Sequence, residues 1–244
     1  MAAVSCGVNA ECRMKNNRNE RRADCPRYRT GVNALKALLW PRRCVICHSF
    51  LEPGADRLCP ACVAAIPEPI SGDRRGAHYR RWASAFWYEG AIRASILRFK
   101  FGGCRFYAHY YGPWLARAVT QCLGTQFDLL TYVAVSPYRR WRRGYDQSAL
   151  LAQAVGKDLD MTPLPTLRKR SRVKPQSRTI DHAERQQNIR GAFRIVDPEA
   201  VRGKRILLID DVLTTGATVS EASHVLLGAG AKSVDVATLA VTRK

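Results

Sequence analysis

Residues 205–218 read RILLIDDVLTTGAT, an apolar run followed by two aspartates and a series of small hydroxyl residues around one glycine. The apolar part, 205–209, is too short and too rich in aliphatic and β-branched residues for a separate helix, which predicts a buried central strand. Such a strand delivers Asp210 and Asp211 to the edge of a sheet. Two adjacent carboxylates repel each other unless a cation or hydrogen-bond donors face them, and a sugar diol with Mg²⁺ meets that need.

The segment 213–218 that follows has the composition of an anion-binding loop. Gly216 permits a left-handed backbone or a close approach, and the hydroxyl groups of Thr214, Thr215 and Thr218 add hydrogen-bond donors. A helix that begins near Thr218 adds the positive end of its dipole. A diol site and a phosphate site at this separation match a ribose 5-phosphate.

Strands and helices alternate over most of the chain. Hydrophobic periodicity predicts strands at 82–88, 129–135, 205–209 and 233–241, and helices at 91–99, 106–123, 147–159 and 219–227. This order predicts an α/β fold in which helices flank a mostly parallel sheet and ligands bind at the carboxyl ends of the strands. The aromatic residues of 106–123 are expected in the core rather than in contact with bases. The prolines, glycines and charges of 66–80 predict a linker.

The composition is that of a basic, folded protein. Its 244 residues contain 40 Lys plus Arg against 20 Asp plus Glu, a formal charge of +20 that attracts polyanions such as nucleotides and nucleic acids. Residues 1–40 are expected to be a basic, disordered arm, within which Met14 is an alternative start. The chain shows neither a signal peptide nor an apolar stretch of the roughly 18 residues that span a membrane, so a cytoplasmic location is expected.

Four of the nine cysteines form two CxxC pairs, Cys44 with Cys47 and Cys59 with Cys62. Each pair can direct two thiolates to one point, and two pairs complete a closed tetrahedral zinc site. The alternatives are buried thiols or a redox pair, and His48 can in principle replace one sulfur. We therefore expect a small zinc module at 41–70 and a larger domain at 80–244.

Residues 206–218 resemble the phosphoribosyl pyrophosphate (PRPP) motif of type I phosphoribosyltransferases. From about residue 44 to residue 242 the chain also resembles the ComF family of competence-associated proteins. That second resemblance rests on the CxxC pairs, Lys100 with its glycines, RRGYDQ at 142–147, Gln176, Arg185, Asn188 and GAF at 191–193. One departure is Asp146, where the family usually has Asn.

The resemblance implies a type I phosphoribosyltransferase-like fold and a role for each motif residue. Asp210 and Asp211 would hold the ribose hydroxyls of PRPP, with Mg²⁺. The residues that would hold the 5-phosphate are Thr214, Thr215, Gly216, Ala217 and Thr218. The pyrophosphate would be held by Arg139 and Arg140, with Arg142 and Arg143 behind them. A mobile lid would correspond to 168–188.

Two functions remain open from the sequence. The first is binding of PRPP and transfer of its ribose 5-phosphate to a nucleophile that the sequence does not identify, with release of pyrophosphate; this chemistry needs no enzyme nucleophile. The second is a non-enzymatic accessory protein of DNA uptake that binds single-stranded nucleic acid and uses the same fold as a scaffold or PRPP sensor. It would use the zinc module, the arm and the arginines at 139–143 and 168–178.

Overall fold

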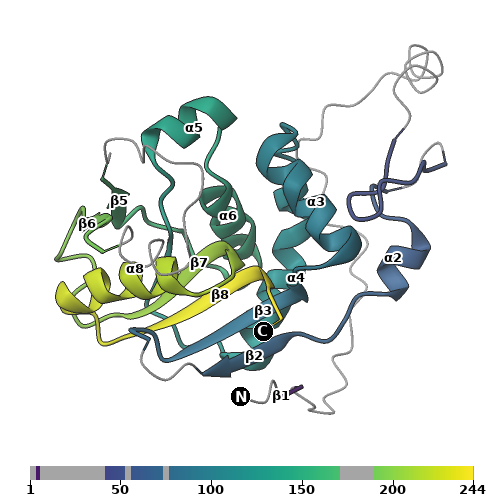
Figure 1. Ribbon diagram of the computed structural model, residues 1–244. Coiled ribbons are helices and arrows are strands. Elements are labelled where there is room, and N and C mark those ends of the chain that lie inside the picture. Colours follow the sequence, from purple (N-terminus) through teal and green to yellow (C-terminus); the bar gives the residue numbers. More distant parts are fainter. Residues whose placement is uncertain (1–3, 6–41, 53–55, 74–76, 171–189, 244) are drawn as a thin grey trace. The chain divides into compact units, whose positions relative to one another are not determined.

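The computed structural model of the chain describes residues 4–5, 42–52, 56–73, 77–170 and 190–243 (Figure 1). Two compact units are present, Gly7–Ile66 and a larger unit formed by Pro67–Lys244 with Met1–Cys6. Most of the arm expected at 1–40 and of the lid expected at 168–188 lies outside the described residues. Among the helices that are described, none combines the length and apolar character needed to cross a lipid bilayer.

A six-stranded sheet with the order β1-β2-β3-β8-β7-β4 forms the centre of the larger unit. Its strands are β1 (Val4–Ser5), β2 (Ile70–Asp73), β3 (Arg81–Trp87), β8 (Ser233–Val241), β7 (Arg205–Leu213) and β4 (Leu129–Tyr132). Neighbouring strands run parallel from β3 through β8 and β7 to β4, and β1 and β2 add antiparallel partners at one edge. The predicted mostly parallel sheet is confirmed.

Helices cover both faces of this sheet (Figure 1). The helices described in this unit are α3 (Gly90–Phe101), α4 (Tyr107–Cys122), α5 (Pro137–Arg143), α6 (Gln147–Leu159) and α8 (Ala217–Gly228), of which α4, α6 and α8 pack on the sheet. Helix α8 packs on β7, β8 and a separate hairpin of β5 (Leu167–Lys169) and β6 (Phe193–Ile195), whereas α4 packs on β3 and α6 on β4 and β7. In Figure 1, α8 lies in front of the sheet, with α4 and α6 behind it.

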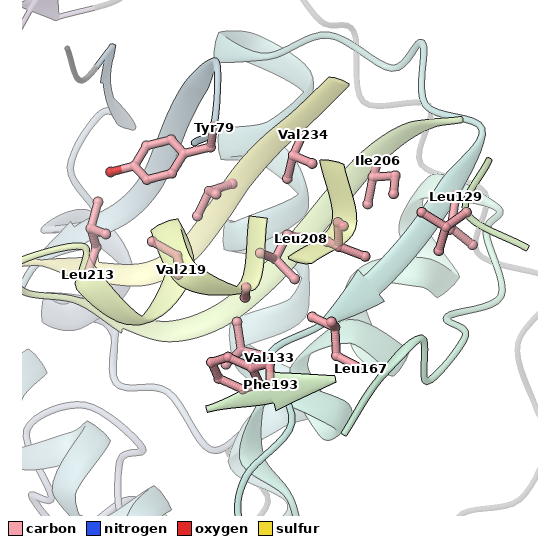
Figure 2. Packing of buried hydrophobic residues seen from close by; sticks show 14 of the residues in the cluster. Tyr79, Leu129, Val133, Leu167, Phe193, Ile206, Leu208, Leu213, Val219 and Val234 are labelled. Atoms are coloured by element: carbon pink, nitrogen blue, oxygen red, sulfur yellow. The ribbon is translucent and has the colours of Figure 1, made fainter. Parts of the chain in front are cut away.

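Apolar side chains from the sheet, α8 and the hairpin form one cluster (Figure 2). Ile206 and Leu208 of β7 alternate toward it, as the period-2 pattern of a strand requires, and both are fully buried. Val219 of α8 and Phe193 of β6 close the cluster from the other side. This packing fixes the strand that carries the two aspartates.

The core position expected for the aromatic residues of 106–123 is confirmed in part: Tyr107 and Tyr111 are buried and Tyr110 and Trp114 are half-buried, whereas Phe106 is 44% exposed. Tyr111 is fully buried and makes an edge-to-face contact with Phe99 of α3, and Phe86 of β3 makes one with Trp114. Tyr111 also shares a hydrogen bond with the buried hydroxyl of Ser95, 2.6 Å away. These contacts attach α3 and α4 to the sheet.

Two predicted strand ends are wrong. β7 continues to Leu213 because β8 pairs with it as far as Val241, so Asp210 and Asp211 lie within the strand rather than after it. β4 ends at Tyr132, earlier than expected.

Three other segments also differ from expectation. Residues 70–73 of the expected linker form β2, which pairs with β3. Helix α3 runs through Lys100 to Phe101, with Gly102 as its C-cap. Residues 137–143, where the sequence predicted no helix, form α5 because Pro137 begins a helical turn that Ser136 caps.

Candidate functional site

The carboxyl end of β7 places Asp210 in a closed, polar environment. Its side chain is 9% exposed, and Oδ1 accepts hydrogen bonds from the hydroxyl of Ser148, at 3.0 Å, and from the N–H of Asp211, at 2.9 Å. Burial, followed by the neighbouring charge of Asp211, raises the pKa of Asp210 to about 7, although the hydrogen bonds from the N–H of Asp211 and from Ser148 and the charge of Lys100 act to lower it. Near neutral pH this carboxyl group can therefore gain or lose a proton.

Lys100 provides the cation that faces the second aspartate. Its Nζ lies 2.9 Å from Oδ1 of Asp211, and both side chains are only 16% exposed. Lys100 belongs to the last turn of α3, far from Asp211 in sequence. The sequence predicted that a cation or hydrogen-bond donors face the carboxylate pair, and Lys100 is a cation in contact with one of the two carboxylates.

The loop that follows β7 turns into the first turn of α8. Gly216 has φ 77° and ψ 0° at the N-cap, a left-handed conformation that favours glycine, and no side chain caps the helix there. The hydroxyl of Thr215 accepts a hydrogen bond from the N–H of Ala217, at 3.3 Å. Thr214 is exposed, and Thr218 is half-buried. This backbone arrangement can hold an anion at the helix N-terminus.

The segment after β4 carries the predicted pyrophosphate arginines on α5. Arg139 and Arg140 are exposed there. Asp146, the N-cap of α6, connects the two ends of this segment because its carboxylate accepts from the N–H of Ala149, at 3.1 Å, and of Val135, at 3.2 Å. Burial raises the pKa of Asp146, while these backbone hydrogen bonds and Arg140 lower it. A carboxylate at this position thus accepts two backbone N–H groups at once.

A cavity of about 890 Å³ opens between α5 and the β5–β6 hairpin. Its lining contains the cations Arg140, Arg168, Lys169, Arg170 and Arg194 and the single acid Asp146. Lys169 is also within electrostatic reach of Arg139 and Asp210, and burial lowers its pKa. Lys169 therefore connects the cavity electrostatically to the acid pair on β7.

In the smaller unit, the sulfur atoms of Cys44, Cys47, Cys59 and Cys62 all lie within 4.8 Å of one another. The sulfurs of Cys47 and Cys59 are 3.7 Å apart. This matches the edge of roughly 3.8 Å in a tetrahedron of sulfurs bonded to an ion at about 2.3 Å. A hydrogen bond with Ser49 lowers the pKa of Cys47 to about 6, which favours the thiolate. The four cysteines can hold a structural metal ion.

Comparison with known proteins identifies the family. The phosphoribosyl transferase domain family matches residues 146–244. Competence protein F of Haemophilus influenzae is 36% identical over 217 residues, which cover 80% of this chain and 94% of that protein. The chain belongs to the ComF family. Competence protein ComFC of Streptococcus pneumoniae is 28% identical over 82% of the chain and 87% of its own length, and DNA utilization protein YhgH of Escherichia coli is 35% identical over 45% and 47%.

Among solved structures, this ComF protein is similar to glutamine PRPP amidotransferase from B. subtilis, with 24% identity and a TM-score of 0.38. The matched region covers 54% of this chain and 26% of the amidotransferase. A second structure, the allosteric regulatory enzyme of purine biosynthesis, has 24% identity and a TM-score of 0.37.

The geometry of this ComF protein adds residues that motif reading did not assign. Ser148 and Lys169 received no role from the sequence, and Lys100 was noted only as part of the family resemblance. Lys100 preceding two glycines is the one signal that a sequence reader could have followed, since a cation at a helix end beside a break often serves a site. Ser148 gives no such signal, because a serine in an amphipathic helix is ordinary.

Proposed function

We propose that this ComF protein is an accessory protein of DNA uptake whose phosphoribosyltransferase-like domain binds PRPP together with Mg²⁺. The observation that carries the ligand assignment is the pair Asp210–Asp211 immediately before a loop that leads into the N-terminus of α8. The role in DNA uptake is supported by relatives named for competence and for DNA utilization.

The acid pair suits a ribose diol and a divalent cation. Sugar hydroxyl groups donate hydrogen bonds, and carboxylate oxygens are ligands that Mg²⁺ prefers. Asp211 is neutralised by Lys100 in the free protein. When Mg²⁺ and the diol contact Asp210 and Asp211, the ammonium group of Lys100 becomes available to a phosphate oxygen, so no buried charge is left unpaired.

The two phosphate positions follow from the elements on either side. Residues 214–218 would hold the 5-phosphate, because short side chains and the open helix end expose backbone N–H groups. Arg139 and Arg140 would hold the pyrophosphate, whose oxygens match the fork of a guanidinium group. Lys169, within electrostatic reach of both Arg139 and Asp210, adds positive charge between these positions.

Transfer of the ribose 5-phosphate is a second candidate activity of the same site. The bond from the anomeric carbon to pyrophosphate would break, and a bond to an incoming nucleophile would form. The ribose gains positive charge in such a substitution, and the adjacent carboxylates of Asp210 and Asp211 favour it electrostatically. Release of pyrophosphate from PRPP in the presence of candidate nucleophiles measures this activity. If no candidate nucleophile causes pyrophosphate release, PRPP binding is the only function left to the site.

We also propose that the four-cysteine cluster holds one structural Zn²⁺. The all-sulfur donor set and the short Cys47–Cys59 distance support zinc, whose closed structural sites use such ligands.

Calorimetric titration with PRPP and Mg²⁺ tests the ligand assignment. We expect binding by the intact protein and its loss in the Asp210→Ala, Asp211→Ala double variant. Asp158→Ala, which removes an exposed acid from α6, is the matched control and keeps the affinity. Absence of PRPP binding by the intact protein, or equal affinity in the double variant, would refute the assignment.

A further inference from the structure

Helix α5 exposes two aromatic side chains that the phosphoribosyl site does not use. Its sequence is PYRRWRR. Tyr138 is 64% exposed, and Trp141, at 81%, is the most exposed large hydrophobic side chain among the described residues. Exposed tryptophan is rare on a surface without a partner, because its large ring loses a favourable apolar contact with the protein interior.

The two rings lie on the same side of the helix. Tyr138 and Trp141 are three residues apart, a spacing that brings side chains together on a helix. Their ring centroids are 6.4 Å apart and the planes are tilted by 33°. The high exposure of both side chains leaves ring surface open to a planar ligand.

The helix is held in place from within the domain. Ser136 caps its first turn and Gly144, with φ 77°, ends it. Arg143 anchors the last turn, because it donates a hydrogen bond of 2.8 Å to Gln147 and lies over the ring of Phe101. Since the fold already orders α5, little conformational entropy of the helix is lost when a ligand binds to the rings.

The charge around these rings is positive. Four arginines and no acid occur in α5, and the adjacent cavity is bordered by exposed Arg168, Arg170 and Arg194 of the hairpin region. Aromatic rings that take bases, next to guanidinium groups that take phosphates, are the two components of single-strand binding surfaces. A duplex offers its phosphates but keeps its bases stacked away from such rings. A lipid surface needs a larger apolar face than one tyrosine and one tryptophan provide.

We infer that α5 and the base of the β5–β6 hairpin bind single-stranded nucleic acid. Tyr138 and Trp141 stack on bases, while Arg142, Arg168, Arg170 and Arg194 contact the phosphates. The inference gives the proposed role in DNA uptake a binding surface and rests on that role, but it does not rest on the binding of PRPP.

Fluorescence anisotropy with a labelled oligothymidylate of about 16 nucleotides tests the surface. Trp141→Ala and Tyr138→Ala should each weaken the affinity by about 5- to 150-fold, since one stacked base is lost. Trp141→Phe should restore most of it. Arg142→Ala should reduce the slope of log K against log salt by about 0.7. Phe106→Ala, which removes an exposed aromatic ring beside α4, is the matched control and should bind normally.

Further measurements distinguish single-strand binding at this surface from other kinds of binding. A duplex of the same length should bind more weakly and without dependence on Trp141, and an oligouridylate should show whether RNA shares the surface. Trp141→Ala should still bind PRPP in calorimetry, so loss of the PRPP site and loss of this surface are distinguishable. No binding of the oligothymidylate, equal binding by Trp141→Ala and the intact protein, or Trp141-dependent binding to anionic vesicles instead, would overturn the inference.

Discussion

Lys100 and Asp211 form an ion pair at the proposed phosphoribosyl site. Each is 16% exposed, so water screens the pair poorly, and Asp210 lies next to it in the chain. Loss of the lysine removes the cation in direct contact with the acid pair and leaves Lys169 and Arg143 within electrostatic reach only. Removal of one partner from a buried pair typically costs about 3 kcal/mol or more.

We therefore expect Lys100→Gln to lower the free energy of unfolding by about 3 kcal/mol at neutral pH. The double variant Lys100→Gln, Asp211→Asn should recover much of that loss, because it leaves no unpaired charge. Urea unfolding followed by circular dichroism measures both. If the single variant unfolded at the same urea concentration as the wild type, the ion pair would not contribute to stability.

The raised pKa of Asp210 makes stability depend on pH. The pKa in the folded state is about 7, above the ordinary value of 3.8, so between these two pH values the folded state binds more protons than the unfolded state. The free energy of unfolding then falls as pH rises through this window. The loss of stability that comes from ionising Asp210 is absent below pH 3.8 and complete above about pH 7.

Asp210→Asn removes this titration and keeps an oxygen that can accept from Ser148. We expect the variant to gain stability relative to the wild type on going from pH 5 to pH 8, in urea unfolding at both values. Asp158→Asn, an exposed acid on α6, should show no such change between the two. If the free energies of unfolding of Asp210→Asn and wild type differed by the same amount at both pH values, the raised pKa of Asp210 would be contradicted.

At the scale of elements, α4 and α6 approach each other closely at Gly112. A Cβ placed there would lie 2.7 Å from Cβ of Ala154 on α6 and 3.1 Å from its backbone carbon. Two helices can come this near only where one of them has no side chain. Because α6 begins at Asp146 and carries Ser148, this contact also positions part of the candidate site.

Gly112→Ala should therefore destabilise the protein by about 1–3 kcal/mol, because the helices must separate. Gly228→Ala is the control. It lies at the end of α8 with nothing within 4 Å of its added Cβ, so we expect it to be neutral or slightly stabilising. Thermal unfolding of the two variants distinguishes them, and similar melting temperatures would mean that α4 and α6 adjust without cost.

The sequence predicted those elements whose own residues determine them. The helix at 147–159 and the strand at 233–241 have the predicted bounds, since their apolar periodicity is uninterrupted. β2 was missed because Ile70-Ser-Gly-Asp73 is short and polar, and it becomes a strand only by pairing with β3. α5 was missed because seven residues form a helix here through capping by Ser136 and Gly144 rather than through an apolar face.

The candidate site likewise contains residues that the sequence identifies and residues that only the packing of the fold brings together. The acids and the loop of β7–α8 are adjacent in sequence, so a motif finds them together. Lys100 and Ser148 reach the acids from two other helices, and only the packing of α3 and α6 around the sheet brings them there. Pairing between distant residues leaves no periodic signal in a single sequence.

At the scale of the whole molecule, we expect the order of the smaller unit to depend on the metal ion proposed for its four-cysteine cluster. Among the described residues of 42–66 there is one short helix, α2 (Pro60–Ala64), in which no residue is buried. An apolar core this small cannot hold four cysteine sulfurs together without a ligand.

We expect about one zinc ion per purified chain, and loss of the ion in Cys44→Ser and Cys59→Ser. Chelation should raise amide hydrogen exchange in 42–66, with the amides of β7 and β8 as an internal reference. Cys104→Ser, outside the cluster, should keep the zinc content. Full zinc content in Cys44→Ser would show that the ion is held elsewhere.

The strand order has a consequence for how the chain is made. β8 lies between β3 and β7, yet it follows both in sequence. While the polypeptide leaves the ribosome, β3 and β7 therefore have no direct pairing with each other, and the parallel sheet between them cannot close until residues 233–241 have emerged. The acid pair of β7 acquires its final strand neighbour at the same moment, so a nascent chain lacking β8 has the motif without the supported site.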